Sequence, residues 1–310
     1  NIISKKMKHL FKYCVPALAA LTSVDVQSQG CSDAGFCTVH SIKTKTPADT
    51  VKKFKNHFKA GFSYGMVQNK IAVYTSYGEF TRMLNQKISL TVKLLYALHH
   101  GDLATTSGIS DAVVTADYHF TESLQLIAGM KIPFNDANKK KNDLSLPMGY
   151  QTSLGSTDMI LGISYIQNNF VFTTAYQQPL IHNNNGFDIS DYPEELLQGI
   201  YYSTNDYKRK GDMLLRVSRH VRFRNNKYLF TPSILPVYHL GNDSYLDNTG
   251  SRTEIADSKG LTLNLNLFLQ YKLTRSTRIE FSVGVPAIAR KVRPDGLSKF
   301  AVGVEYGVDF

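Results

Sequence analysis

The residue types used for hydrolysis lie close together at Asp117 and His119, with serines nearby in the sequence. A serine, a histidine and an acid can act together as nucleophile, base and orienting group. However, the local alternation of residues places His119 on the inward face of its expected strand, and neither Gly-x-Ser-x-Gly nor His-Asp-Ser-Asn-Gly occurs. The sequence therefore predicts a structural role for this pair and no catalytic residues.

The other histidines do not have the spacing of a helical metal site. They mark expected strand ends and loops, at His99, His100, His182, His220 and His239. Two cysteines with His40 would supply too few ligands for a zinc site. We therefore expect no metal and no cofactor.

The beginning of the chain has the pattern of an export signal. A basic segment starts at Met7, an apolar stretch follows, and the chain turns polar at Asp25. We assign residues 1–30 to upstream residues and a cleaved signal peptide, and residues 31–56 to a periplasmic segment. An exported chain meets an oxidising compartment, so Cys31 and Cys37 are expected to form a disulfide, with lipidation of Cys31 as an alternative.

The remainder of the chain, residues 57–310, consists of alternating apolar and polar residues. In the clearest case, 261–273, every odd position is Leu or Tyr and the even positions are mostly polar. This period of two is typical of β-strands. We expect twelve strands, although ten or fourteen are also compatible. They lie near 57–68, 70–84, 86–97, 109–121, 123–134, 157–167, 169–180, 209–222, 226–239, 261–273, 276–287 and 298–310.

The connections distinguish a membrane barrel from a soluble sandwich. Short links alternate with long ones, so all long loops would lie at one end of the sheet. Aromatic residues gather near the expected strand ends, as they do at bilayer interfaces. These features predict an all-β fold, a transmembrane antiparallel up-and-down β-barrel in the bacterial outer membrane, where outer-membrane lipid surrounds it.

Several charged residues lie between outward apolar neighbours and should point into the lumen. They are Lys93, Asp117, His119, Lys131, Lys272, Glu280 and Glu305. If these side chains pair with one another, they fill the interior. If they line water instead, they set the charge selectivity of a channel.

Residues 181–208 form the longest expected outer loop. Its candidate ligand contacts are Phe187, Asp188, Asp191, Tyr192, Tyr201 and Tyr202. The loop could fold over the mouth and collect a ligand, or it could be an exposed variable loop. Both interpretations remain open from the sequence.

The last strand ends on an alternating apolar pattern at Tyr306, Val308 and Phe310. This pattern resembles the assembly signal of outer-membrane barrels, and the resemblance implies the barrel-assembly machinery as a partner. The formal net charge is +10, but the charges are scattered through loops and alternate strand positions. We therefore expect no nucleic-acid partner.

Two stretches carry a family resemblance. Residues His100–Asp111, with an expected turn at Gly-Ile-Ser-Asp, and Gly129–Phe134 with the polar residues after it resemble the family named for the MetA pathway of phenol degradation. That family groups with FadL-like outer-membrane channels, and the Cys31–Cys37 segment resembles its Bacteroidetes members. The resemblance covers roughly residues 57–310. It implies a channel or transporter for small, hydrophobic or aromatic molecules.

The sequence therefore predicts an outer-membrane channel and no enzyme. Two functions of other classes remain as alternatives. One is an outer-membrane lipid-modifying enzyme, and the other is a structural or adhesive barrel that binds a partner through its outer loops. Architecture alone does not identify the cargo.

Overall fold

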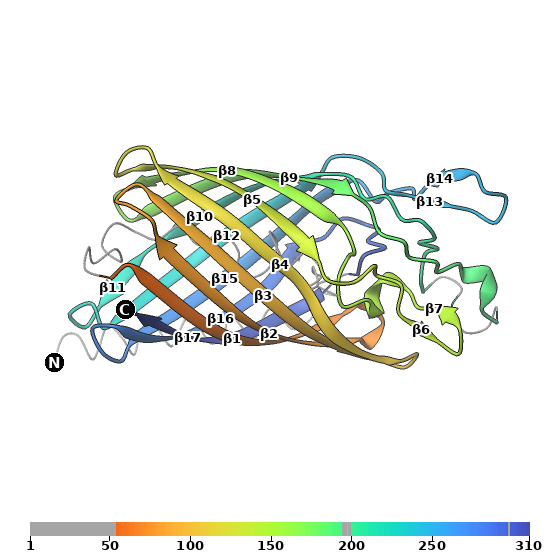
Figure 1. Ribbon diagram of the computed structural model, residues 1–310, viewed down its shortest axis with the longest axis horizontal. Coiled ribbons are helices and arrows are strands. Elements are labelled where there is room, and N and C mark those ends of the chain that lie inside the picture. The colour runs from red at the N-terminus through yellow and green to blue at the C-terminus, as the bar shows by residue number, and fades with distance from the viewer. Residues whose placement is uncertain (1–53, 194–196, 198–199, 297) are drawn as a thin grey trace.

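The computed structural model describes residues 54–193, 197, 200–296 and 298–310. It is a closed barrel of twelve antiparallel strands, as the sequence predicts (Figure 1). The strands are β1 (Asn56–Val67), β2 (Ala72–Met83), β3 (Ile88–His100), β4 (Thr105–His119), β5 (Leu124–Pro133), β8 (Thr157–Gln167), β9 (Phe170–Ile181), β10 (Asp212–Arg219) continued by β11 (Val221–Phe223), β12 (Tyr228–His239), β15 (Gly260–Lys272), β16 (Thr277–Ile288) and β17 (Ser298–Asp309). Among the described residues, no helix is long and apolar enough to cross a membrane.

Each strand pairs with its neighbours in the chain, and β1 pairs with β17 to close the barrel. The backbones of Asn56 and Phe310 exchange two hydrogen bonds of 2.9 Å where the first and last strands meet. Closure leaves no unpaired sheet edge along the wall.

The two ends of the barrel differ in their connections. At one end, here called the turn end, the links are short, and Asn168, Arg224, Asn225 and Asn226 adopt positive φ angles that tight turns require. At the other end, the loop end, the first two connections are short, and the connections after β5, β9, β12 and β16 are long and extend well beyond the strands (Figure 1). The predicted segregation of long loops to one end is therefore present.

The alternation of side chains separates an apolar exterior from a polar interior. Outward residues such as Phe62, Leu94 and Leu161 are 49%, 45% and 46% exposed. Inward residues such as Thr173, Gln177 and Asn266 are buried. Aromatic residues near the strand ends, among them Phe120, Phe134 and Phe310, also lie exposed on the outside.

The structure corrects several details. β4 starts at Thr105, four residues before the predicted start, and the expected Gly-Ile-Ser-Asp turn lies inside this strand. The register shifts there, and both Ser110 and Asp111 are buried, so this segment is a bulge and not a turn. The predicted strand 209–222 is interrupted between β10 and β11.

Short elements missed from the sequence lie in the loops. Two small hairpins pair β6 (Lys140–Lys141) with β7 (Leu144–Ser145) and β13 (Ser244–Leu246) with β14 (Arg252–Glu254). Single 3-10 turns occupy η1 (Gln68–Lys70), η2 (Met148–Tyr150) and η3 (Ile189–Asp191). The predicted signal peptide and the Cys31–Cys37 disulfide lie outside the described residues.

Candidate functional site: the lumen and its capped mouth

Near the turn end, charged side chains from four neighbouring strands meet inside the barrel. We call Lys59, Tyr77, Glu79, Lys93 and Glu305 the turn-end cluster. Lys59 Nζ lies 3.1 Å from Glu79 Oε1 and 3.6 Å from Glu305 Oε1. The Tyr77 hydroxyl donates to Glu305 at 2.6 Å, and the ammonium of Lys93 lies 3.9 Å from the centroid of the Tyr77 ring. The cluster neutralises its own charges in a buried setting.

Tyr77 reaches over β1 toward β17 because its neighbour on β1 is Gly61, which has no side chain. A Cβ atom at Gly61 would lie 2.3 Å from the Tyr77 ring. The ring therefore occupies space that any other residue at position 61 would fill. This close approach lets the Tyr77 hydroxyl meet Glu305 from β17.

The barrel seam is held at the turn-end rim by a second set of charges. His57 Nδ1 lies 2.7 Å from Asp309 Oδ1, and Arg278 donates to the other oxygen of Asp309 at 2.7 Å. These contacts join β1, β16 and β17. Together with the backbone hydrogen bonds between β1 and β17, they hold the first and last strands to each other.

Apolar side chains fill the middle of the lumen. This apolar layer consists of Tyr77, Leu95, Val113, Ile160, Ala175, Leu214, Leu235 and Val237, all buried and packed together. All of them point inward, although the interior of a water-filled barrel is polar. The layer separates the turn-end cluster from the charges at the loop end.

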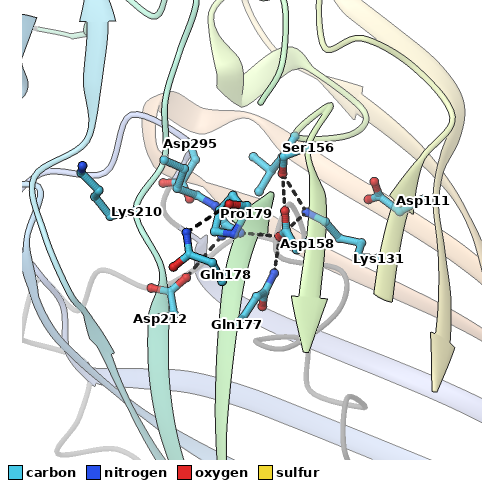
Figure 2. Close-up of polar contacts among 12 residues, drawn as sticks. Asp111, Lys131, Ser156, Asp158, Gln177, Gln178, Pro179, Lys210, Asp212 and Asp295 are labelled. Atoms are coloured by element: carbon cyan, nitrogen blue, oxygen red, sulfur yellow. Dashed lines mark hydrogen bonds and ion pairs between the residues drawn. The ribbon is translucent and has the colours of Figure 1, made fainter. Parts of the chain in front are cut away.

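At the loop end, a second buried network holds the mouth. We call Lys131, Asp158, Arg209, Asp212, His239 and Asp243 the loop-end cluster. Lys131 Nζ lies 3.0 Å from Asp158 Oδ2, and both side chains are fully buried. The same carboxylate accepts hydrogen bonds from Arg209, Gln177 and Ser156. Figure 2 shows Lys131, Ser156 and Gln177 converging on Asp158.

The loop-end cluster connects strand ends to the long loops. His239, the last residue of β12, lies between two carboxylates, with Nδ1 2.7 Å from Asp212 and Nε2 2.8 Å from Asp243. Asp243, in the loop after β12, accepts from the Tyr207 hydroxyl at 2.7 Å and from the backbone of Lys210 at 2.9 Å. One carboxylate therefore ties the loop after β12 to the loop before β10.

The last long loop adds a compact group of two arginines and an acid. Arg290 and Arg293 both donate to Asp295, at 3.3 Å each, and all three side chains are buried. Burial by itself would raise the pKa of Asp295, but the guanidinium groups of Arg293 and Arg290 hold that pKa well below its usual range. Asp295 is therefore ionised and anchors the loop between β16 and β17.

Apolar residues from four loops close the mouth above these charges. Met148 and Leu154 follow β5, Tyr207 precedes β10, Ile255 precedes β15, and Val292 follows β16; all five are buried in one cluster. A neighbouring cluster packs Tyr150 and Leu146 on Val67, Ile71 and Val73 of the first hairpin. The loops therefore cross the mouth and form a packed cap.

Tyr150 fixes the cap to the rim at β3 and β4. Its hydroxyl accepts from the backbone of Leu103 at 3.1 Å, and its carbonyl accepts from Thr106 at 2.5 Å. A Cβ atom at Gly101 would lie 2.5 Å from the Tyr150 oxygen, so this position needs glycine for the close approach. The η2 turn is thereby held against β3 and β4.

A cavity of about 110 Å³ opens the lumen at the turn end. Its wall is formed by β1, β9, β10, β12 and β15 to β17, and its rim includes residues Thr274 to Thr277. We call this space the vestibule. It lies below the apolar layer and beside the turn-end cluster.

The predicted inward residues do not form one site. Lys93 and Glu305 are in the turn-end cluster, and Lys131 is in the loop-end cluster. Glu280, Glu305 and Lys272 line the vestibule. Asp117 accepts from the Ser89 hydroxyl at 3.2 Å, and His119 lies half-buried at the turn end of β4. The serine contacts the aspartate directly, whereas in a hydrolytic triad a histidine lies between the two.

The predicted ligand contacts of residues 181–208 are largely used to hold the loops. Phe187 is fully buried, and its ring lies 5.5 Å from that of Tyr192 and 6.4 Å from that of Tyr201. Asp188 accepts from Ser190 and Ser203, Asp191 ends the η3 turn, and the Tyr192 hydroxyl donates to Ser145. Tyr202 is 48% exposed. At the end of the chain, Tyr306 and Phe310 lie exposed on the outside of the barrel.

Sequence reasoning missed most of the loop-end cluster. Asp158 and Asp212 lie at inward positions in the first two residues of their strands, which the period of two could have identified. Arg209 lies in the loop before β10, although the predicted strand starts there, and Asp243 lies in the loop after β12, where no periodicity assigns a direction. Among the described residues, no three His, Cys, Asp or Glu side chains are placed to hold a metal ion.

Comparisons with known proteins return barrels of several kinds. No protein family matches the sequence, and no curated protein does so either. Among solved structures, the translocator domain of autotransporter NalP from Neisseria meningitidis gives a TM-score of 0.47 at 8% identity, covering 84% of this chain and 90% of that chain. The Ralstonia pickettii toluene transporter TbuX gives 0.42 at 10% identity, with coverage of 83% and 90%. The P. putida toluene transporter TodX gives 0.42 at 9% identity, with the same coverage. At such scores these likenesses carry no argument about function.

Proposed function

We propose that this protein is an outer-membrane channel that carries small molecules and is closed at its outer mouth in this conformation. The observation that carries the proposal is the vestibule, which opens a polar lumen at the turn end while loops close the other end. A barrel wall with an apolar exterior suits a bilayer, because every wall backbone group is paired within the sheet. In such barrels the longer loops face the outside.

Passage of a molecule would require the cap to move and the side chains of the apolar layer to rearrange. The cap consists of loops tied to the wall by side chains, chiefly through Asp243, Tyr207 and Tyr150. The wall itself is held by continuous backbone ladders. Opening the mouth by moving loops therefore breaks far fewer hydrogen bonds than deforming the wall.

A finer part of the proposal concerns the cargo. The apolar layer would let a small hydrophobic or aromatic molecule pass without losing contact with apolar surface. It would disfavour the passage of a strongly hydrated ion. We therefore propose hydrophobic or aromatic molecules as cargo, in agreement with the resemblance of the sequence to FadL-like channels.

Planar-bilayer conductance of the refolded protein tests the proposal. We expect rare current steps from the natural protein and more frequent openings from the double variant Tyr207→Phe, Met148→Ala, which loosens the cap. Tyr118→Phe, on the exposed outer wall, is the matched control and should behave like the natural protein. A panel of aromatic and fatty acids would then show which class reduces the current.

Silence of both the natural protein and the cap variant, when both are correctly inserted, would contradict a channel. A second candidate function would then be favoured, a barrel that binds a partner through its outer loops. One observation supports it: the β13–β14 hairpin projects beyond the capped mouth as an ordered surface (Figure 1).

A further inference from the structure

We propose that the vestibule binds a small oxyanion, of the phosphate or short carboxylate class. This inference goes beyond the channel and does not require one, because the vestibule is reached from the turn end whether or not the cap opens. It rests on the charge, the size and the hydrogen-bonding groups of the cavity wall.

The wall of the vestibule carries an excess of positive charge. Five of its residues are Lys or Arg and three are acids. The basic residues are Lys59, Arg216, Lys272, Arg275 and Arg278, and the acids are Glu280, Glu305 and Asp309. A cleft with a net excess of positive charge raises the local concentration of anions.

The acids are already engaged with donors of the barrel. Glu305 accepts from Tyr77 and pairs with Lys59, and Asp309 accepts from His57 and Arg278. Within the described part of the chain, Lys272 and Arg275 have no carboxylate at ion-pair distance. These two side chains therefore supply the positive charge that a ligand can use.

Arg216 lies deeper in the same wall and is only 4% exposed. The hydroxyl groups of Ser218 and Thr231 and the amide of Gln270 lie in the wall as well. Guanidinium, hydroxyl and amide groups are the donors that proteins use for phosphate and carboxylate oxygens. The combination favours an oxyanion over a halide.

Size narrows the ligand class. A cavity of about 110 Å³ is smaller than the roughly 150 Å³ of an engineered cavity that holds benzene. The vestibule in this conformation therefore has room for an ion of a few heavy atoms. We therefore choose inorganic phosphate and acetate as the two probe ligands.

Calorimetric titration of the refolded, detergent-solubilised protein with phosphate and, separately, with acetate tests the inference. We expect saturable binding of at least one of the two at low ionic strength. In the double variant Lys272→Gln, Arg275→Gln, affinity should fall by about tenfold or more, since charged hydrogen-bond donors are lost. The relative affinities of the two probes show whether the vestibule prefers a phosphate or a carboxylate.

The matched control is Lys87→Gln, Arg224→Gln, which removes the same charges from other turns at this end and outside the vestibule. It should bind as the natural protein does. No saturable binding of either probe, or an equal loss in both double variants, would overturn the inference. A protein that binds oxyanion but never conducts would contradict only the proposed channel.

Discussion

The turn end and the loop end of this barrel bury similar charges by different means. The turn-end cluster is made entirely by strand residues on regular ladders, where Lys59 faces Glu79 and Glu79 faces Lys93. The loop-end cluster joins strand residues to loop residues, such as His239 to Asp243 and Asp158 to Arg209. One network is rigid because its backbone is rigid, whereas the other holds segments that could otherwise move.

This difference bears on function. Charges held by ladders stay paired whatever the loops do, so the turn end is a permanent part of the wall. Charged side chains that link loops to strands lose their partners and become hydrated if the loops move away from the barrel mouth. Any opening of the barrel is therefore expected at the loop end, and the three predictions below test this contrast.

The largest effect is expected for Asp158→Ala. The change leaves Lys131 and Arg209 buried without their shared carboxylate, and loss of one partner of a buried ion pair costs about 3–5 kcal/mol. We expect the free energy of unfolding in urea to fall by that amount and the loops to become sensitive to trypsin. A stability equal to that of the natural protein would show that the network does not hold the mouth.

A smaller effect is expected for Glu305→Gln in the turn-end cluster. The amide oxygen can still accept from Tyr77, and Lys59 keeps Glu79 as a partner. The free energy of unfolding should fall by about 1.5–3 kcal/mol, typical of a hydrogen bond to a charged group. Trypsin sensitivity of the loops should not change, and a loop response as large as that of Asp158→Ala would remove the contrast between the two ends.

The smallest effect is expected in the turn between β13 and β14. Asp247 accepts from the Thr249 hydroxyl, from the backbone of Ser251 and from other donors of this exposed turn, and these bonds lower its pKa from 3.8 to about 2. A lowered pKa stabilises the folded turn above pH 3.8, and the contribution is lost as the pH falls through about 2.

We therefore expect the amide resonance of Ser251 to titrate near pH 2 in a labelled sample. Thr249→Val should move the midpoint upward, because the Thr249 hydroxyl bond is the largest cause of the shift. The rest of the barrel should not respond. A midpoint near 4 in the natural protein would show that the turn does not form.

The sequence by itself determined the barrel. The period of two assigned the faces of the strands, and the alternation of short and long links assigned the two ends, because both are local properties of the chain. The same period pointed Lys93, Lys131 and Glu305 inward. The bulge at Ser110 and Asp111 interrupts this alternation. An extra residue in a strand makes the following side chains point to the face opposite the one that the period of two predicts.

Only the tertiary structure decided which charges meet and whether the mouth is closed. The partners of Asp158 and Asp243 come from loops far away in the sequence, at Arg209 and Tyr207. A loop has no repeating geometry that would fix the direction of its side chains. Its position follows from packing against other loops, as Met148 and Val292 show, and that packing exists only once the barrel has brought the loops to one end.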